Sequence, residues 1–138
     1  MPHRKTSLLI YVLTVLLAAG ATLVAHNDER VRKLFEGKLA HVPGHTLTAE
    51  VVDYPPDGKS SVHHHAGSVF AYVLKGKIRS QNSATGAARI YKTGETFFEP
   101  AGSAHLVSEN ASASEPASLL AIHVAADGAV LTKPSHAK

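Results

Sequence analysis

Histidine is the residue type in this sequence that offers chemistry. Three histidines stand in a row, His63, His64 and His65, and another follows at His105. In a strand, successive side chains point to opposite faces, so His63 and His65 share one face and His64 takes the other. Two imidazoles on one face make half of a metal site, and His105 is an available third ligand. The competing interpretation is that each histidine lies at the surface or is hydrogen-bonded in the core. For a lone histidine this interpretation is the commoner one.

The composition restricts the choice of metal ligands. The sequence has 138 residues with 10 histidines and no cysteine. Disulfides, thiolate zinc sites and a cysteine nucleophile are therefore excluded. Histidine is the only strong nitrogen ligand left for a transition metal.

The charge balance argues against nucleic acid as a partner. Lysine and arginine total 14 against 11 aspartates and glutamates, a net charge of +3. Arg4 and Lys5 precede an apolar segment, and without them the balance is 12 to 11. A domain with so little net positive charge lacks the basic surface that nucleic acids require.

The composition is that of a folded protein. With 44% apolar and 18% charged residues, the chain is expected to fold as one domain.

The first 25 residues predict an export signal or a membrane anchor. No residue from Ser7 to Ala25 is charged, and Arg4 and Lys5 precede this stretch. As a helix its 19 residues would extend ~28 Å, just enough to cross a bilayer core as an anchor. The short apolar part at 8–18 and the small residues at 19–21 favour a cleaved signal peptide. In both cases the rest of the chain is expected outside the cytoplasm, in the periplasm or beyond.

The remainder of the chain predicts strands rather than helices. Residues 26–44 have little to bury and are expected to form a loose arm or a single helical turn. Short branched segments bounded by Gly, Pro, Ser or Asn follow, at 45–54, 61–65, 69–75, 77–82, 88–92, 96–99, 105–110 and 117–125. This spacing is typical of an all-β antiparallel sandwich or barrel over residues 45–126. The tail at 127–138 is expected to fray.

Two motifs around the histidines resemble those of the cupin family. The first combines a glycine, His-x-His, a glutamate and a second glycine, and the matching residues here are Gly58, His63, His65 and Gly76. The second combines a glycine, Pro-x-Gly, a histidine and an asparagine, and the matching residues here are Gly94, Pro100, Gly102 and His105. Val69 stands at the glutamate position and Glu109 at that of the asparagine. The resemblance implies a small jelly-roll barrel that pairs into a homodimer.

The same resemblance implies a metal site formed by His63, His65 and His105. Valine cannot coordinate a metal, so Val69 leaves the place of the usual glutamate open. Three neutral nitrogen ligands leave a divalent ion its full charge, which makes it a stronger Lewis acid. This ligand set resembles that of the iron dioxygenases among the cupins. Zinc, manganese, nickel and copper are also compatible with it.

Counting faces along the predicted strands yields candidate residues for binding a small-molecule ligand. These candidates are Val69, Ala71, Phe98, Val107, Glu109, His123, Arg79 and Gln81. The phase of the last strand is undetermined, so His123 either enters the cavity or stays at the surface. Arg79 facing inward would indicate an anionic substrate, but the apolar Ile78 competes for the inward position. The sequence assigns no catalytic residue.

Two functions remain open from the sequence. The first is an exported mononuclear metalloenzyme, a dioxygenase-like oxidoreductase that acts on a small oxygenated or anionic molecule. The second is a non-catalytic cupin that binds or senses a small ligand, with a structural metal or none.

Overall fold

The computed structural model describes residues 28–135. The predicted signal peptide or anchor lies outside these residues. Within them, no helix has the length and apolar character needed to span a membrane.

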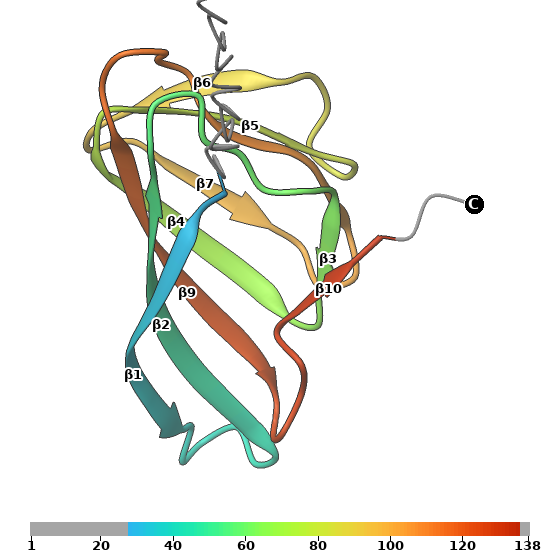
Figure 1. Cartoon of the computed structure of the whole chain (residues 1–138). Coiled ribbons are helices and arrows are strands. Elements are labelled where there is room, and N and C mark those ends of the chain that lie inside the picture. The colour runs from blue at the N-terminus through green and yellow to red at the C-terminus, as the bar shows by residue number, and fades with distance from the viewer. Residues whose placement is uncertain (1–27, 136–138) are drawn as a thin grey trace, which may run out of the picture.

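The described chain forms two antiparallel sheets of five strands each (Figure 1). The first sheet has, in spatial order, β1 (Arg30–Lys38), β2 (His45–Tyr54), β9 (Ala117–Ala126), β4 (Ser68–Lys75) and β7 (Thr96–Glu99). The second has β10 (Thr132–Pro134), β3 (His63–His65), β8 (Ala104–Asn110), β5 (Lys77–Asn82) and β6 (Arg89–Lys92). The predicted all-β antiparallel architecture is confirmed, and it is consistent with a jelly roll.

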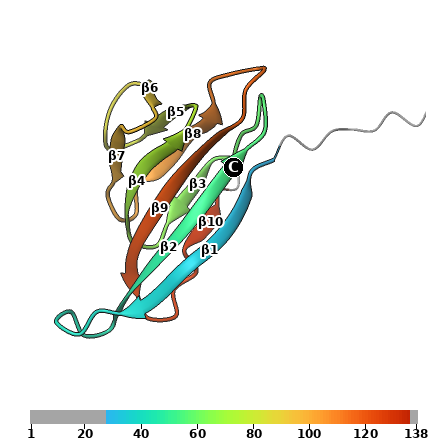
Figure 2. The same cartoon turned by 90° about the vertical axis from the view of Figure 1, so that its left-hand side faces the viewer.

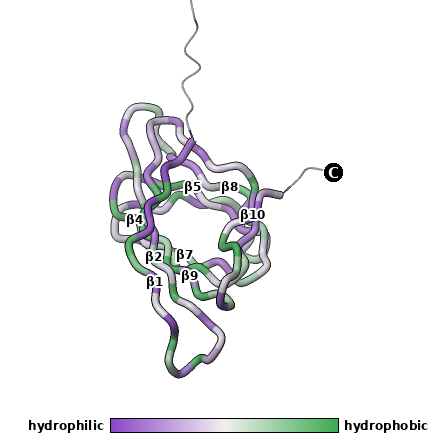
Figure 3. Tube along the Cα trace, turned by 60° about the horizontal axis from the view of Figure 1, so that its bottom comes forward, coloured by the Kyte–Doolittle hydropathy of each residue, from purple (hydrophilic) through white to green (hydrophobic). Residues whose placement is uncertain are grey.

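Alternating burial along the strands explains how the sheets enclose an interior. In β9 every second residue from Ala117 to Ala125 is buried. Three members of this row, Ala117, Leu119 and Ala121, belong to one core cluster with Val69 and Val73 of β4 and Ile78 of β5, so side chains from both sheets meet between them. The traces of the two sheets run around this common interior (Figure 3).

Both ends of the described chain differ from the expected arm and tail. Residues 30–38 form β1, which pairs along β2 and lies beside it as a long edge strand (Figure 2). An edge strand is held by backbone hydrogen bonds to one neighbour, so it can form with nearly all of its side chains exposed. At the other end, β10 pairs with β3, with Thr132 opposite His65. Part of the expected tail therefore forms an edge strand beside the strand that carries two of the histidines.

Candidate metal centre

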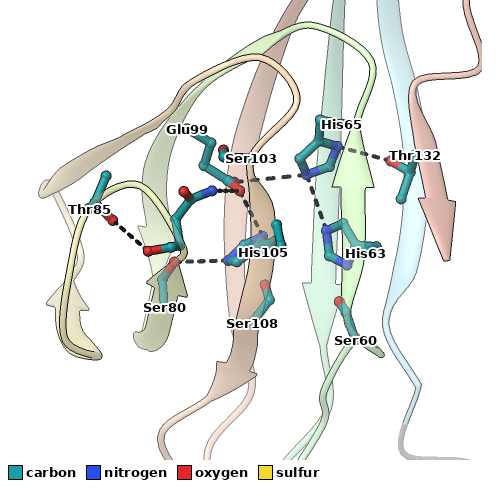
Figure 4. Close-up of polar contacts among 12 residues, drawn as sticks. Ser60, His63, His65, Ser80, Thr85, Glu99, Ser103, His105, Ser108 and Thr132 are labelled. Atoms are coloured by element: carbon teal, nitrogen blue, oxygen red, sulfur yellow. Dashed lines mark hydrogen bonds and ion pairs between the residues drawn. The ribbon is translucent and has the colours of Figure 1, made fainter. Parts of the chain in front are cut away.

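Strand pairing brings the three predicted ligands together. His63 and His65 lie on β3, and His63 pairs directly with His105 on the neighbouring β8. All three side chains are buried. Each offers a nitrogen atom, and these atoms lie within 4.8 Å of one another (Figure 4). His64 points to the opposite face, where its Nδ1 is 2.7 Å from the Ser135 hydroxyl.

Backbone carbonyls orient the two histidines of β3. The Nδ1 of His63 lies 2.7 Å from the carbonyl oxygen of Ser61, and the Nδ1 of His65 lies 3.3 Å from that of Leu131. A carbonyl oxygen only accepts hydrogen bonds, which assigns a proton to Nδ1 of His63. The Nδ1 of His65 also lies 3.2 Å from the Thr132 hydroxyl, which can donate to it, so the surroundings of His65 fit either tautomer. The Nε2 atoms of His63 and His65 face each other at 3.1 Å.

This arrangement fits a metal ion. Burial, with repulsion from His63 and His123, lowers the pKa of His65 to about 4, so its ring is neutral near neutral pH. When both rings carry a proton on Nδ1, the two Nε2 lone pairs face each other at 3.1 Å and repel unless a cation lies against both. Neutral imidazole with its second nitrogen hydrogen-bonded to a carbonyl is also the usual state of a metal-binding histidine. His63, His65 and His105 are therefore the residues that would hold the ion.

His105 is placed between a hydroxyl and a carboxyl group. Its Nε2 lies 2.9 Å from Ser80 Oγ on β5, and its Nδ1 lies 3.1 Å from Glu99 Oε2 on β7. A serine hydroxyl donates or accepts, so Ser80 satisfies either tautomer of the ring. Burial, followed by repulsion from His63 and His65, lowers the pKa of His105 to about 3.

Glu99 is a site residue that sequence reasoning missed. Its side chain is 2% exposed, its Oε2 accepts a 3.2 Å hydrogen bond from Asn82 Nδ2, and its Oε1 lies 3.9 Å from His65 Nε2. Burial raises the pKa of Glu99 to about 7. The alternation of side chains in the predicted strand 96–99 could have identified it. If Phe97 rather than Phe98 is taken as the inward residue, Glu99 faces inward as well, because it lies two residues further along the strand.

Ionisable residues flank Val69 on both sides. Val69 on β4 pairs with Glu99 on β7 and with His123 on β9, so all three share the inner face of the sheet. His123, whose phase was open from the sequence, is buried with its Nε2 3.5 Å from Glu50 Oε2. Its Nδ1 has no hydrogen-bond partner within the described part of the chain. The glutamate position of the first motif thus lies between a carboxyl group and an imidazole.

Comparison with known proteins identifies the family. A family model described as a cupin domain matches residues 50–123, more than half of the chain. The chain belongs to the cupin family. No match was found among curated proteins.

Several solved structures share the cupin fold of this chain. A cupin domain from Bordetella pertussis is 14% identical with a TM-score of 0.56, covering 73% of this chain and 97% of that one. The DMSP lyase DddQ from Ruegeria pomeroyi is 20% identical with a TM-score of 0.55, covering 64% of this chain and 43% of the lyase. An oxalate decarboxylase from Bacillus subtilis is 24% identical with a TM-score of 0.53, covering 64% of this chain and 23% of that chain. This cupin therefore spans less than half of either enzyme, and at these identities the likeness shows the fold alone.

The histidines of this cupin open onto a cavity of about 300 Å³. Apolar side chains form much of its wall, namely Val31, Val52, Val69, Ala71, Phe97, Leu119, Ala121 and Leu131. The polar residues beside the histidines and Glu99 are Glu29, Glu50, Tyr54, Ser60, Ser108 and Thr132. Among residues 28–135, no lysine or arginine lines this cavity.

Of the predicted ligand-binding residues, Val69, Ala71 and His123 line the cavity, whereas Phe98, Val107, Glu109, Arg79 and Gln81 do not. Phe98 is 53% exposed on the outer face, while its neighbour Phe97 faces in. The prediction that Phe98 faces the cavity was therefore wrong, because the inward positions of β7 are shifted by one residue.

A bulge in β8 changes which of its residues face inward. Asn82 of β5 pairs with His105, but the adjacent Gln81 pairs with Val107, so one extra residue, Leu106, lies between them. Such a bulge shifts the alternation by one position. Beyond it Ser108 is buried and lines the cavity in place of Val107.

Arg79 and Glu109 pair with each other away from the cavity. They are direct partners across β5 and β8, and their side chains form a partly exposed ion pair at 3.3 Å. Ile78 and Ser80 take the buried positions of β5. Gln81 also turns away, and its Nε2 donates to the carbonyl oxygen of Gly86. Arg79 and Glu109, which were candidates for binding a ligand, therefore do not line the cavity.

Proposed function

We propose that this cupin is an exported, mononuclear metalloenzyme of the dioxygenase type, with iron(II) held by His63, His65 and His105. The observation that carries the proposal is the cluster of three buried histidines, whose nitrogen atoms lie within 4.8 Å of one another at the wall of the cavity. Bound iron would supply Lewis acidity and the binding of dioxygen. The alternative is a cupin that binds a small ligand without turning it over.

The cavity wall argues for a small oxygenated substrate. A volume of about 300 Å³ lies at the lower end of the range for small-molecule sites. Since no lysine or arginine of the described residues lines it, the ion would be the group that neutralises a substrate anion. The apolar walls would receive the hydrocarbon part and exclude water. A molecule with one or two oxygen ligands on a compact apolar body fits these surroundings.

A cluster of hydroxyl groups offers hydrogen bonds to such a substrate. The Tyr54 hydroxyl lies 2.7 Å from Ser108 Oγ and 3.0 Å from Ser60 Oγ, and all three side chains line the cavity. Burial raises the pKa of Tyr54, so its hydroxyl keeps its proton as a donor. We expect this cluster to orient a second oxygen of the substrate.

The test begins with the full chain expressed in a bacterium and fractionated by compartment. We expect the protein in the extracytoplasmic fraction, to bind one iron(II) per chain, and to consume dioxygen with a diketone, thiol or phenolic acid. His105→Ala should weaken metal binding by ~100-fold or more, whereas His64→Ala, on the opposite face, should leave it unchanged.

Three outcomes would contradict the proposal in different ways. Recovery of the intact chain from the cytoplasm would refute export. Failure of iron(II), zinc or cobalt to bind would refute the metal centre. One bound iron per chain with no dioxygen uptake across the panel would favour the non-catalytic alternative.

A further inference from the structure

We propose that Glu99 is a fourth metal ligand, which supplies from β7 the carboxylate that Val69 does not supply from β4. The inference rests on the proposed function, because it requires a metal ion at His63, His65 and His105. It changes the site predicted from the sequence, in which no acidic group reaches the ion.

Sheet register places the two positions together. Val69 and Glu99 are direct partners in the antiparallel pairing of β4 with β7. Directly opposed residues point to the same face of a sheet, with Cβ atoms about 4.5 to 5.5 Å apart. A glutamate side chain is long enough to span that offset. A carboxylate from either strand therefore reaches the same part of the cavity.

Two of the distances in the cluster match ligands of one ion. Two ligand atoms each ~2.1 Å from the same metal, at angles of 90° to 110°, lie roughly 3.0 to 3.4 Å apart. Glu99 Oε2 lies 3.1 Å from His105 Nδ1, and His63 Nε2 lies 3.1 Å from His65 Nε2. Glu99 Oε1 lies 3.9 Å from His65 Nε2, longer than this range, and connects the two pairs (Figure 4).

The surroundings of Glu99 call for a cation. A carboxylate that is 2% exposed is costly to bury unless a positive charge or several donors compensate it. Asn82 donates one hydrogen bond to Oε2, and no lysine or arginine of the described residues reaches the cavity. When His105 carries its proton on Nε2, toward Ser80, its Nδ1 lone pair also faces the carboxylate. A metal ion satisfies both groups.

Asn82 holds the carboxylate in place. Its Oδ1 accepts a 2.9 Å hydrogen bond from the backbone N–H of Ala84, which fixes the orientation of the amide. Its Nδ2 is thereby directed at Glu99.

The carboxylate changes the charge of the proposed site. With three imidazoles and one carboxylate as ligands, the net charge of a site that holds a divalent ion would fall to +1. An ion that takes six ligands would keep two positions for substrate and water.

The test measures cobalt(II) affinity of the metal-free full chain by competition with a chromophoric chelator. Glu99→Gln keeps the size of the side chain and its ability to accept a hydrogen bond, but removes the charge. We expect it to weaken cobalt(II) binding by more than ~100-fold, beyond the usual effect of a group that only orients a ligand. Glu50→Gln is the matched control, because Glu50 lines the same cavity but contacts His123. It should change the affinity by less than ~3-fold and leave the cobalt(II) visible spectrum unaltered.

A double substitution separates coordination from mere orientation of His105. Val69→Glu combined with Glu99→Val moves the carboxylate back to β4, and we expect cobalt(II) affinity to return to within ~10-fold of the natural chain. Affinity of Glu99→Gln equal to that of the natural chain, or no recovery in the double variant, would overturn the assignment of Glu99. Loss of binding in His105→Ala would still support the metal centre. If the natural chain bound no metal at all, the proposed function would fall as well.

Discussion

Three buried histidines of the cavity, His65, His105 and His123, are kept neutral by desolvation. Burial is the first cause that lowers the pKa of His105 to about 3 and those of His65 and His123 to about 4. Neutral imidazole is the form that binds a metal, so the fold prepares the ligands before an ion arrives. The cost of this preparation is a dependence of stability on pH.

We expect the metal-free protein to lose stability as the pH falls from 6.5 to about 4. In this window the unfolded chain takes up protons on three imidazoles that stay neutral in the fold, so the free energy of unfolding decreases. Glu99 opposes the trend, because its pKa is raised to about 7 and its protonated form is favoured in the fold. The loss of stability from three imidazoles is expected to exceed the gain from one carboxyl group.

Urea unfolding in the presence of a chelator, repeated across this pH range, checks the expectation. His64→Ala is the control variant, because it removes an exposed imidazole of the same strand that does not line the cavity. A free energy of unfolding that stayed constant or rose on acidification would contradict it.

Strand β3 can reach the cavity because the chain passes very close to β9 on its way to β4. The close approach is made by Gly67, where an added Cβ would overlap the backbone carbonyl of Val124. Only a residue without a side chain fits this contact. The position of the two β3 histidines relative to the first sheet therefore depends on one glycine.

Substitution of this glycine should disturb both stability and the metal site. We expect Gly67→Ala to reduce the free energy of unfolding by about 1 to 3 kcal/mol, because β9 backbone has to move. It should also weaken cobalt(II) binding through displacement of His65. Chemical denaturation and metal competition would measure the two effects. Ala66→Ser, at the exposed neighbouring position, should change neither, and an equal effect of both substitutions would argue against the close contact as the cause.

The outer face of the first sheet carries an exposed apolar patch. Phe70 and Phe98 are direct partners across β4 and β7 and are 43% and 53% exposed. Tyr72 and Leu74 continue this exposed row along β4. Contiguous apolar surface of this kind commonly marks an interface between proteins. It is the surface on which we expect the homodimer predicted from the family resemblance.

Charge introduced into this patch should separate the dimer. We expect Phe98→Asp to raise the dissociation constant by about 30-fold or more, as for a central aromatic residue of an interface. Ile90→Asp is the control, because Ile90 is similarly exposed but lies on β6 of the other sheet. Sedimentation velocity over a range of concentrations would show the difference. A natural chain that sediments as a monomer at high concentration would refute the prediction.

The sequence predicted those features that depend on local alternation. His63 and His65 share a face because they lie two residues apart in one strand, and the boundaries of β2, β5 and β7 follow from branched residues and the turns around them. Residue 98 was assigned to the wrong face because two adjacent phenylalanines carry no phase information. β1 was missed because the pattern of its side chains does not reveal a strand held by backbone pairing at an edge.

What the sequence determined by itself was the strands between residues 45 and 126, the cupin motifs and the three histidines, since these depend on neighbours along the chain. Only the tertiary structure decided that Glu99 lies opposite Val69, that a bulge at Leu106 turns Ser108 inward, and that His123 enters the cavity. Each of these depends on the register between strands far apart in sequence. A shift of one residue in that register reverses the face of every side chain, and the alternation within a single strand does not encode it.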